Sequence, residues 1–510
     1  GRAANFFGIH AMIYPGDNIE MHLDWAYHLV GEGGYVKFIA NPIDRNTAGP
    51  DERTVAVLNG IYDRGMIPIV RLTTNWADGI WSLPDSDGPG DYTPWAAAAK
   101  RVVEGFPLQR GVPLYVEILN EVNLSLEWGG TPPDPAAYGR LLADAAKAIR
   151  SIGDPRIRIV SGGLSPNGEY DNVEFLTNMF TEVPESLYAF DVLGSHPYPG
   201  DHPPEYNIHD GTAKETRNTI DAYLNELAVV EKFGRKGVKV ILSETGYALG
   251  NNAYQWEGMP AVTEELRADY TVRAFRDYWS KWPEIIAVTP FELSATAAKN
   301  WTEFDWVSPY SRSGENGYPT HPKPVYEAVA ALPKPPFLPE EELMQAESRN
   351  RYPFAEEDPL NFALQASVRV SSSIEENGWS RRKLNDNRAA PQDLGWSSGG
   401  GKREEWVQLT FEEPRTVSRL VLRPRTDAIK PGAYFPQAFT LAYSNDGGRT
   451  FREAFAKRYE EPNFNPGTEE QVYTFPPFTA SIIRLIVTEK TNMGDGDYYV
   501  QLAELKVYEK

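Results

Sequence analysis

The sequence of 510 residues contains no cysteine. This absence excludes disulfide bonds, thiolate zinc sites, iron–sulfur clusters and a cysteine nucleophile. The chain also lacks an apolar run of the roughly 18 residues that cross a bilayer, so we expect no membrane span. Any chemistry must therefore use carboxylates, histidine, serine, lysine or tyrosine.

Positive charge is also scarce. The chain has 50 Lys and Arg residues against 71 Asp and Glu residues, which gives a formal net charge of −21. A surface of this sign repels a polyanion, so we expect no nucleic acid partner. The content of 41% hydrophobic and 24% charged residues is typical of a globular protein with a sizeable core. At roughly 150 residues per domain, the length predicts two or three domains.

Short apolar runs alternate with helical patterns from residue 1 to about residue 332. Eight such runs separated by helices favour a (β/α)8 TIM barrel over an open sheet. Asp134 and Pro135 are typical of a helix start, and apolar residues then recur at helical spacing to Arg150. The predicted strands are Phe6–Ile13, Tyr35–Ala40, Ile67–Thr73, Leu114–Asn120, Ile157–Ser161, Phe190–Ser195, Val238–Ser243 and Ile285–Phe291.

The pattern changes twice after the predicted barrel. Residues 333–358 are rich in proline and acidic residues, which indicates a linker. Residues 359–510 contain short alternating strands with no long helical pattern, which favours an all-β sandwich. The strands expected there include Trp406–Phe411, Ser418–Leu422, Ala438–Ser444 and Ile482–Thr488.

Three glutamates lie in or next to apolar strands of the predicted barrel. Period-two alternation puts Glu117, Leu119 and Glu121 on one face, with Glu121 at the carboxyl-terminal rim. Glu244 follows another strand at the same kind of position. Burying a carboxylate is costly unless it is paired or protonated, so the position of each glutamate requires a structural or functional explanation. We expect Glu117 to pair with Arg71, and the two rim glutamates to perform chemistry.

Glycoside hydrolysis by a retaining enzyme needs two carboxyl groups about 5 to 5.5 Å apart, one as acid and one as nucleophile. An inverting enzyme would need a gap of roughly 6.5 to 9.5 Å. Tryptophans in the predicted loops at this rim are candidates for stacking on sugar rings. They are Trp76, Trp81, Trp95, Trp128, Trp256, Trp301 and Trp306.

At these residues the sequence resembles the clan of retaining β-glycosidases built on (β/α)8 barrels, with catalytic glutamates on strands 4 and 7. The resemblance rests on Asn120-Glu121, on Glu244 and on His196-Pro197-Tyr198. The segment 134–165 is similar to glycoside hydrolase family 39. Val122 stands where the clan usually has proline, and Phe291-Glu292 where a sugar-stacking tryptophan is common.

The resemblance implies that Glu121 is the general acid/base and Glu244 the nucleophile. It also implies that Asn120 binds the sugar 2-hydroxyl, while Tyr198 or His196 orients the nucleophile and holds it ionised. No cofactor is expected for catalysis. The remaining residues that we expect to contact substrate are Arg71, Trp128, Glu292 and Trp301.

The second domain resembles the discoidin-like, coagulation factor type C fold, a jelly-roll sandwich shared by carbohydrate-binding modules of family 32. The resemblance rests on the order of short motifs, among them Gly395-Trp396-Ser397 and Leu502-Ala503-Glu504. It implies a structural calcium ion held by Asp386 and Glu504, and oxygen ligands suit this hard cation. Candidate ligand-binding residues of the module are Arg423, Arg425, Tyr434, Phe435 and Tyr498.

Together these features predict a secreted retaining glycoside hydrolase. It would cleave a β-linked poly- or oligosaccharide by double displacement and would be targeted to its substrate by the carbohydrate-binding module. The alternative is a non-catalytic surface protein whose barrel only binds glycan. Paired glutamates at the rim favour the enzyme, because a binding groove does not need two close carboxylates.

Overall fold

The protein forms two compact units in a computed structural model, residues Gly1–Glu347 and Ser348–Lys510. The structure describes residues 2–296, 301–312, 315–346, 358–375, 377–388 and 394–510. The division between the units falls inside the proline-rich segment that the sequence predicts to be a linker.

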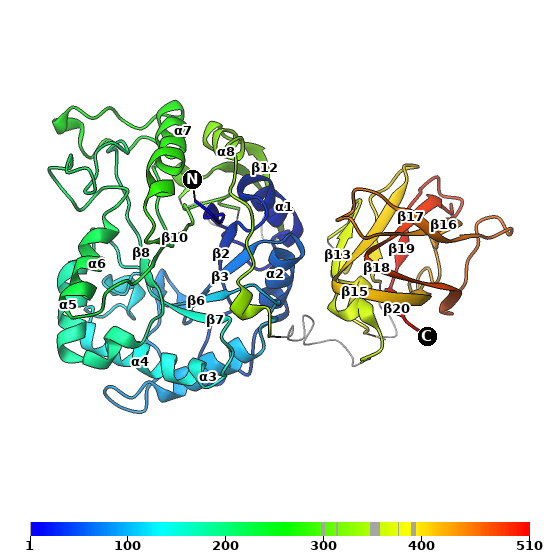
Figure 1. The fold of residues 1–510 in the computed structure, drawn as a ribbon, viewed down its shortest axis with the longest axis horizontal. Coiled ribbons are helices and arrows are strands. Elements are labelled where there is room, and N and C mark those ends of the chain that lie inside the picture. The colour runs from blue at the N-terminus through cyan, green and yellow to red at the C-terminus, as the bar shows by residue number, and fades with distance from the viewer. Residues whose placement is uncertain (1, 297–300, 313–314, 347–357, 376, 389–393) are drawn as a thin grey trace. The chain divides into compact units, whose positions relative to one another are not determined.

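The first unit is a nearly closed barrel of eight parallel strands, as predicted (Figure 1). Five strands form one sheet in the order β1-β2-β3-β6-β7, and three form another in the order β10-β9-β8. Single parallel bridges, Phe7 to Val288 and Val160 to Val192, join the two sheets. The strands are β1 (Gly8–His10), β2 (Tyr35–Ile39), β3 (Ile67–Leu72), β6 (Leu114–Ile118), β7 (Ile157–Ser161), β8 (Leu193–Ser195), β9 (Val240–Leu242) and β10 (Ile285–Val288).

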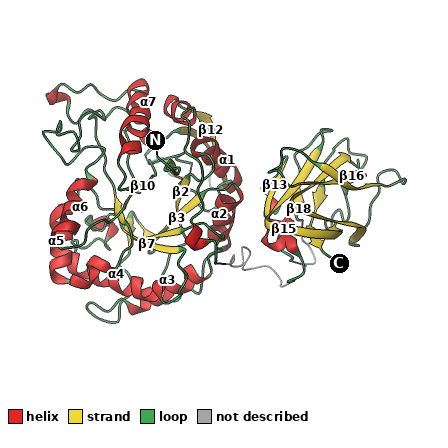
Figure 2. Ribbon diagram, in the orientation of Figure 1, coloured by secondary structure: helices red, strands yellow, loops and turns green. Residues whose placement is uncertain are grey.

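An α-helix follows each barrel strand, and the helices surround the ring of strands (Figure 2). In the described part of the chain, no helix is long and apolar enough to cross a membrane. The helices are α1 (Ile19–Val30), α2 (Glu52–Asp63), α3 (Thr93–Glu104), α4 (Pro135–Arg150), α5 (Asn172–Glu182), α6 (Tyr223–Lys232), α7 (Glu264–Arg273) and α8 (Pro324–Ala330).

Helix α4 forms where the sequence predicts it. The Asp134 side chain accepts a hydrogen bond from the Ala137 backbone N–H at 3.0 Å, and Pro135 occupies the first turn. These are the features that satisfy free N–H groups at a helix start. The apolar face that includes Tyr138, Leu141 and Ile149 is buried.

Two β-hairpins extend the loops at the carboxyl-terminal rim. The first, β4 (Trp76–Ala77) with β5 (Ile80–Trp81), follows β3. It turns through Asp78 and Gly79, both at positive φ, which is the geometry that a two-residue hairpin turn requires. The second, β11 (Val307–Arg312) with β12 (Glu315–Pro322), follows β10. Loops at this rim are where barrel enzymes build their active sites.

A buried ion pair lies inside the barrel and corrects one prediction. Glu117 pairs with Lys37, Nζ to Oε1 at 2.8 Å, and not with Arg71. Both side chains are fully buried, and neither has another hydrogen-bonding partner in the described structure. Glu117 and Lys37 belong to the fourth and second barrel strands, and alternate strands contribute side chains to the same interior layer. Arg71, on the third strand, belongs to a different layer.

The second unit is an all-β sandwich. Five of its strands form the order β13-β15-β18-β16-β17, β20 also pairs with β15, and β14 pairs with β19. The core includes Leu384, Trp396, Phe435 and Phe439. The strands are β13 (Ser367–Val370), β14 (Trp396–Ser397), β15 (Glu405–Arg423), β16 (Ala438–Ser444), β17 (Arg452–Arg458), β18 (Gln471–Glu489), β19 (Gln501–Leu502) and β20 (Glu504–Tyr508).

The strands predicted at Trp406–Phe411 and Ser418–Leu422 are the two halves of β15. The register against β18 shifts between Thr410 and Arg415 and again between Val417 and Arg419. Such irregularities bend a strand without ending it. The alternating pattern therefore located both halves but not their continuity.

The Lys37–Glu117 pair gives a stability prediction. Lys37→Met leaves a carboxylate buried without a partner, so we expect the free energy of unfolding to fall by about 3–5 kcal/mol. Adding Glu117→Leu should recover much of this loss. Denaturant titration followed by helical circular dichroism reports on the unit that contains the α-helices. As a control, Arg45→Ala removes an exposed pair with Asp87 and should cost less than about 1 kcal/mol. Equal losses from the two single variants would contradict the prediction.

Candidate active site

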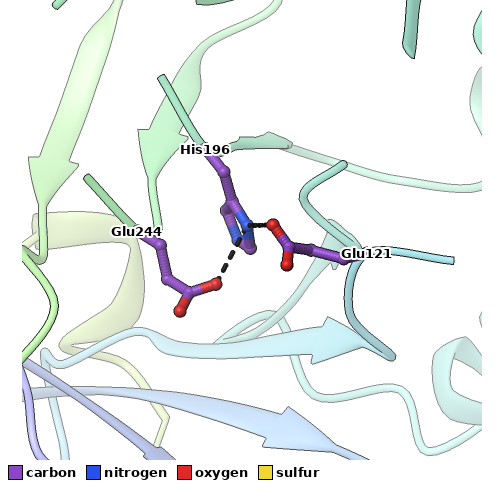
Figure 3. A group of neighbouring side chains, drawn as sticks. All are labelled: Glu121, His196 and Glu244. Carbon is purple, nitrogen blue, oxygen red and sulfur yellow. Dashed lines mark hydrogen bonds and ion pairs between the residues drawn. The ribbon is translucent and has the colours of Figure 1, made fainter. Parts of the chain in front are cut away.

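Three titratable side chains meet at the carboxyl-terminal rim of the barrel (Figure 3). Glu121 lies three residues after β6, His196 directly follows β8, and Glu244 lies two residues after β9. His196 Nδ1 is 3.0 Å from Glu121 Oε2 and 2.9 Å from Glu244 Oε2. One nitrogen or oxygen atom from each residue lies within 4.8 Å of the others. The two glutamates are thus close enough for one small group to contact both.

The backbone around Glu121 departs from strand geometry. β6 ends at Ile118, and both Leu119 (φ 63°) and Glu121 (φ 38°) lie in the left-handed region. The alternation that groups Glu117, Leu119 and Glu121 on one face therefore does not extend to Glu121. Side chains other than glycine adopt this conformation at a cost of order 1–3 kcal/mol, and such residues are concentrated at functional sites. The Glu121 N–H donates to the Gly163 carbonyl at 2.8 Å, which holds the turn.

Gly163 also makes room for His196. A Cβ atom at position 163 would lie 2.3 Å from both Nε2 and Cδ2 of the imidazole, far inside van der Waals contact. The requirement for glycine is therefore one of space, imposed by the ring between the two carboxylates.

The charges in this cluster shift the pKa values of His196 and Glu244. Burial lowers the pKa of His196, but the charges of Glu244 and Glu121 outweigh it and raise that pKa to about 10. Burial raises the pKa of Glu244, but His196 and Lys37 hold it well below its usual range. At neutral pH the site therefore contains an imidazolium beside an ionised Glu244.

Tyr198 contacts the same carboxylate. Its hydroxyl is hydrogen-bonded to Glu244, and burial together with the charge of Glu244 raises the pKa of Tyr198 well above its usual value. The phenol therefore stays neutral and donates a hydrogen bond to the carboxylate. His196 and Tyr198 both hold Glu244 in position.

Arg71 and Asn120 meet at a carboxylate that the sequence analysis missed. Glu127 accepts a hydrogen bond from Asn120 Nδ2 at 3.1 Å and contacts Arg71 Nη2 at 3.4 Å. Burial raises the pKa of Glu127 to about 7, although Arg71 opposes the shift. The Arg71 guanidinium also lies 5.0 Å from the ring of Trp81. The sequence offers only a weak indication of Glu127, as an acidic residue next to Trp128 in a predicted rim loop.

The other predicted contact residues differ in exposure. Glu292 is buried near Glu244, and burial, with Asp305 and Glu244, raises its pKa to about 9. The Trp301 side chain is 55% exposed and lies near Phe291 and Phe304. Trp128 is buried and packs edge-on against Tyr138. Of the further tryptophans, Trp95 and Trp306 are buried, whereas Trp76 and Trp256 are exposed.

One imidazole and two carboxylates are also a donor set for a divalent cation. To ligate a metal through Nδ1, His196 would have to release the proton that it shares with the glutamates. The high pKa of His196 opposes this step. The arrangement instead places a protonated imidazole between the ionised Glu244 and the carboxyl group of Glu121.

In the second unit, Asp386 and Glu504 lie close together. Glu504 is fully buried, and its Oε1 accepts a hydrogen bond from the Asn387 N–H at 3.0 Å. Burial and the neighbouring Asp386 raise the pKa of Glu504 well above its usual value. Glu504 Oε2 has no hydrogen-bond donor in the described structure. Two adjacent carboxyl groups with a buried unsatisfied oxygen fit a hard cation.

Most of the residues considered for ligand binding in the module are buried. Phe435 is a core residue, and Tyr434 is also buried. Arg425 is buried in a pair with Asp427, Nε to Oδ1 at 2.6 Å. These three residues therefore support the fold. Tyr498 is half-buried, with the Lys402 ammonium 5.0 Å from its ring, and Arg423 donates to the Arg388 carbonyl at 3.1 Å.

Comparison with known proteins assigns the second unit. Residues 367–505 match the F5/8 type C domain, so the sandwich has the discoidin-like fold. No curated protein matches the sequence. Similar solved structures include chitosan-binding module 1 of a chitosanase/glucanase from Paenibacillus sp. IK-5, at 23% identity over 29% of this chain and 98% of that chain, with a TM-score of 0.23.

Two further solved structures are similar over 29% and 28% of the chain. The family 32 module of Streptococcus pneumoniae EndoD is 22% identical over 29% of this chain and 99% of that one, with a TM-score of 0.24. The family 32 module of Clostridium perfringens NanJ, solved with galactose, is 18% identical over 28% of this chain and 94% of that one, with a TM-score of 0.23.

The raised pKa of His196 predicts how the free energy of unfolding depends on pH. His196 has a raised pKa in the folded state, against about 6.5 when unfolded. Its contribution to stability is therefore complete below about pH 6.5 and is lost as the pH rises through about 10. We expect the difference in unfolding free energy between the natural protein and His196→Gln to shrink over this range. NMR titration of the seven histidines, with the His196→Gln spectrum for assignment, measures the pKa directly. Loss of the His196 proton below pH 7 would contradict the raised pKa of this residue.

Proposed function

We propose that the barrel is a retaining glycoside hydrolase that cleaves β-linked poly- or oligosaccharides, related to glycoside hydrolase family 39. The observation that carries the proposal is the close approach of Glu121 and Glu244 around one protonated histidine. Retaining enzymes need carboxyl groups about 5 to 5.5 Å apart, and inverting enzymes need roughly 6.5 to 9.5 Å to fit a water molecule. One carboxylate oxygen of Glu121 lies within 4.8 Å of one carboxylate oxygen of Glu244, and this separation favours retention.

In the first displacement, Glu121 gives its proton to the glycosidic oxygen as the bond from that oxygen to the anomeric carbon breaks. Glu244, held ionised by His196 and Lys37, attacks the anomeric carbon from the opposite face. The products are the released alcohol and a glycosyl ester on Glu244.

In the second displacement, Glu121 is ionised and acts as the base. It takes a proton from water, the water oxygen bonds to the anomeric carbon, and the ester bond to Glu244 breaks. The two inversions restore the β configuration. Glu121 is protonated again and Glu244 is again a carboxylate, so the cycle closes.

The surrounding groups would bind the sugar. Asn120 Oδ1 has no hydrogen-bond partner in the described structure and would accept a hydrogen bond from the 2-hydroxyl, while its Nδ2 is held by Glu127. Glu292, neutral at the pH where Glu244 is ionised, would donate to a sugar hydroxyl. Trp301 offers an exposed ring for stacking. Arg71 would position Glu127, and Trp128 would pack the loop that contains it.

The discoidin-like domain would bind carbohydrate and target the barrel to an extracellular polysaccharide. Asp386 and Glu504 would hold a calcium ion whose charge allows both to ionise, and this ion would fix the segment around Asn387 against β20. The alternative function is glycan binding by the barrel without catalysis. The unequal acidity of Glu244 and Glu292 in one site favours the enzyme, since binding alone does not require it.

Substitution of the glutamates tests the mechanism. We expect Glu244→Gln to abolish turnover and Glu121→Gln to reduce kcat by about 10²–10⁴-fold on substrates with poor leaving groups. Rates are measured on a panel of aryl β-glycosides and β-linked oligosaccharides, with the product anomer followed by NMR. Glu104→Gln, an exposed residue of α3, is the control. Turnover by Glu244→Gln at the natural rate, or an inverted product, would overturn the assignment.

Calcium binding is tested by calorimetry of the full chain. Calcium at about 100 times its Kd should stabilise the second unit by about 2.7 kcal/mol, seen as a higher Tm for one transition. Asp386→Asn and Glu504→Gln should lose this increase. Glu470→Gln, which alters an exposed carboxylate paired with Lys506, should retain it. A Tm that does not respond to calcium or to a chelator would contradict the site.

A further inference from the structure

Two adjoining hollows lie beside the proposed catalytic residues. The inner hollow, of about 330 Å³, includes Tyr198, Gly246 and Phe304 in its lining. Tyr198 contacts Glu244, and Gly246 lies two residues beyond Glu244, so this hollow is next to the proposed nucleophile although Glu244 does not line it. The outer hollow, of about 740 Å³, is lined by parts of α5, α6 and the loop after β8. Asn167, Asn218 and Tyr254 line both hollows, so the two adjoin, and together they are called the groove.

The inner hollow is uncharged. Among the described residues that line it, the side chains are amides, aromatic rings, alanine methyl groups or glycine hydrogens. Amides both donate and accept hydrogen bonds, as sugar hydroxyls require, and aromatic rings contact the apolar faces of pyranoses. An ionised sugar would find no partner for its charge there. The lining therefore suits a neutral carbohydrate.

The wall shared by the two hollows is held rigidly before any ligand binds. The Tyr254 hydroxyl donates to Asn218 Oδ1 at 2.6 Å, and Asn218 Nδ2 donates to the Tyr198 carbonyl at 3.1 Å. The Tyr254 ring also stacks on His202 with 3.9 Å between centroids. These contacts connect the loop after β9 to the loop after β8. Groups ordered in advance lose little entropy on binding.

The charged residues of the outer hollow are paired with protein groups. Arg217 Nη2 lies 3.3 Å from Asp171 Oδ1, and Glu215 Oε2 accepts from the Asn218 N–H at 3.1 Å. The ionic groups therefore support the wall, and two carboxylates against one guanidinium disfavour an anionic ligand. Each hollow has a volume in the range of small-molecule sites, about 300–1,000 Å³, so the groove has room for more than one sugar unit.

From this geometry we propose that the groove binds successive units of an uncharged oligosaccharide, so that the enzyme acts on chains rather than on single glycosides. The proposal rests on the proposed hydrolase function and adds the substrate class. Tyr254 and Asn218 form the wall of a subsite beyond the one at Glu121 and Glu244. Binding there lowers the barrier to cleavage because energy from remote sugar units contributes to the transition state.

The test measures kcat/KM of the full chain on β-linked oligosaccharides of two to six units. The series contain glucose, mannose, xylose, galactose or N-acetylglucosamine, and uronic acid oligomers serve as charged comparisons. For the series that is cleaved, we expect kcat/KM to rise at least about tenfold from the shortest to the longest chain, which corresponds to about 1.4 kcal/mol.

Variants show which residues the rise of kcat/KM with chain length requires. Tyr254→Ala and Asn218→Ala should remove most of the increase in kcat/KM for long chains. Circular dichroism and the Tm of each variant show that the barrel remains folded. Tyr254→Phe keeps the ring and should keep part of the increase. Glu104→Gln is the control, because Glu104 is an exposed residue of α3 that does not line either hollow.

The failures of the two proposals are distinguishable. Cleavage that does not depend on chain length, or an equal increase in Tyr254→Ala, would overturn the groove and leave the hydrolase function intact. Preference for the uronic acid oligomers would overturn the uncharged substrate class. A natural protein with no more activity than Glu244→Gln on every series would overturn both proposals.

Discussion

The site depends on one proton held between two carboxylates. His196 lies between Glu121 and Glu244 and contacts both carboxyl groups through Nδ1. The positive charges of His196 and Lys37 hold Glu244 in its ionised form. The result is a pair of chemically identical side chains in unequal environments. The lowered pKa of Glu244 supports the role of nucleophile that we propose for it.

The barrel sets the positions on which that interaction depends. Parallel strands end at one rim, so Glu121, His196 and Glu244, which are far apart in sequence, meet there. Strand periodicity and the positions of these residues at strand ends predicted the eight-stranded barrel and the two glutamates. Periodicity could not identify the partner of Glu117, because a repeat of two tells which face a residue occupies but not which strand lies across the interior. Glu127 was missed for a related reason: its role depends on the path of a loop.

In the second unit too, the sequence pattern predicts the strands but not the course of the loops. Alternation located both halves of β15, and the match over residues 367–505 confirms the discoidin-like fold. The sequence did not reveal which loop aromatics face outward, and Tyr434 and Phe435 are in fact buried. Asp386 and Glu504, separated by more than a hundred residues, were paired only through the resemblance to a known fold. Their contact arises from the packing of a loop against β20.

Gly163 limits how this site can change. Its lack of a side chain is what allows the imidazole to lie between the carboxylates, yet it has no functional side chain and follows a different strand from Glu121, His196 and Glu244. In a library of variants selected for activity, position 163 should accept almost no replacement, while exposed neighbours along the same loop tolerate many. The residue least visible to a search for reactive groups is therefore among the most constrained positions in the barrel.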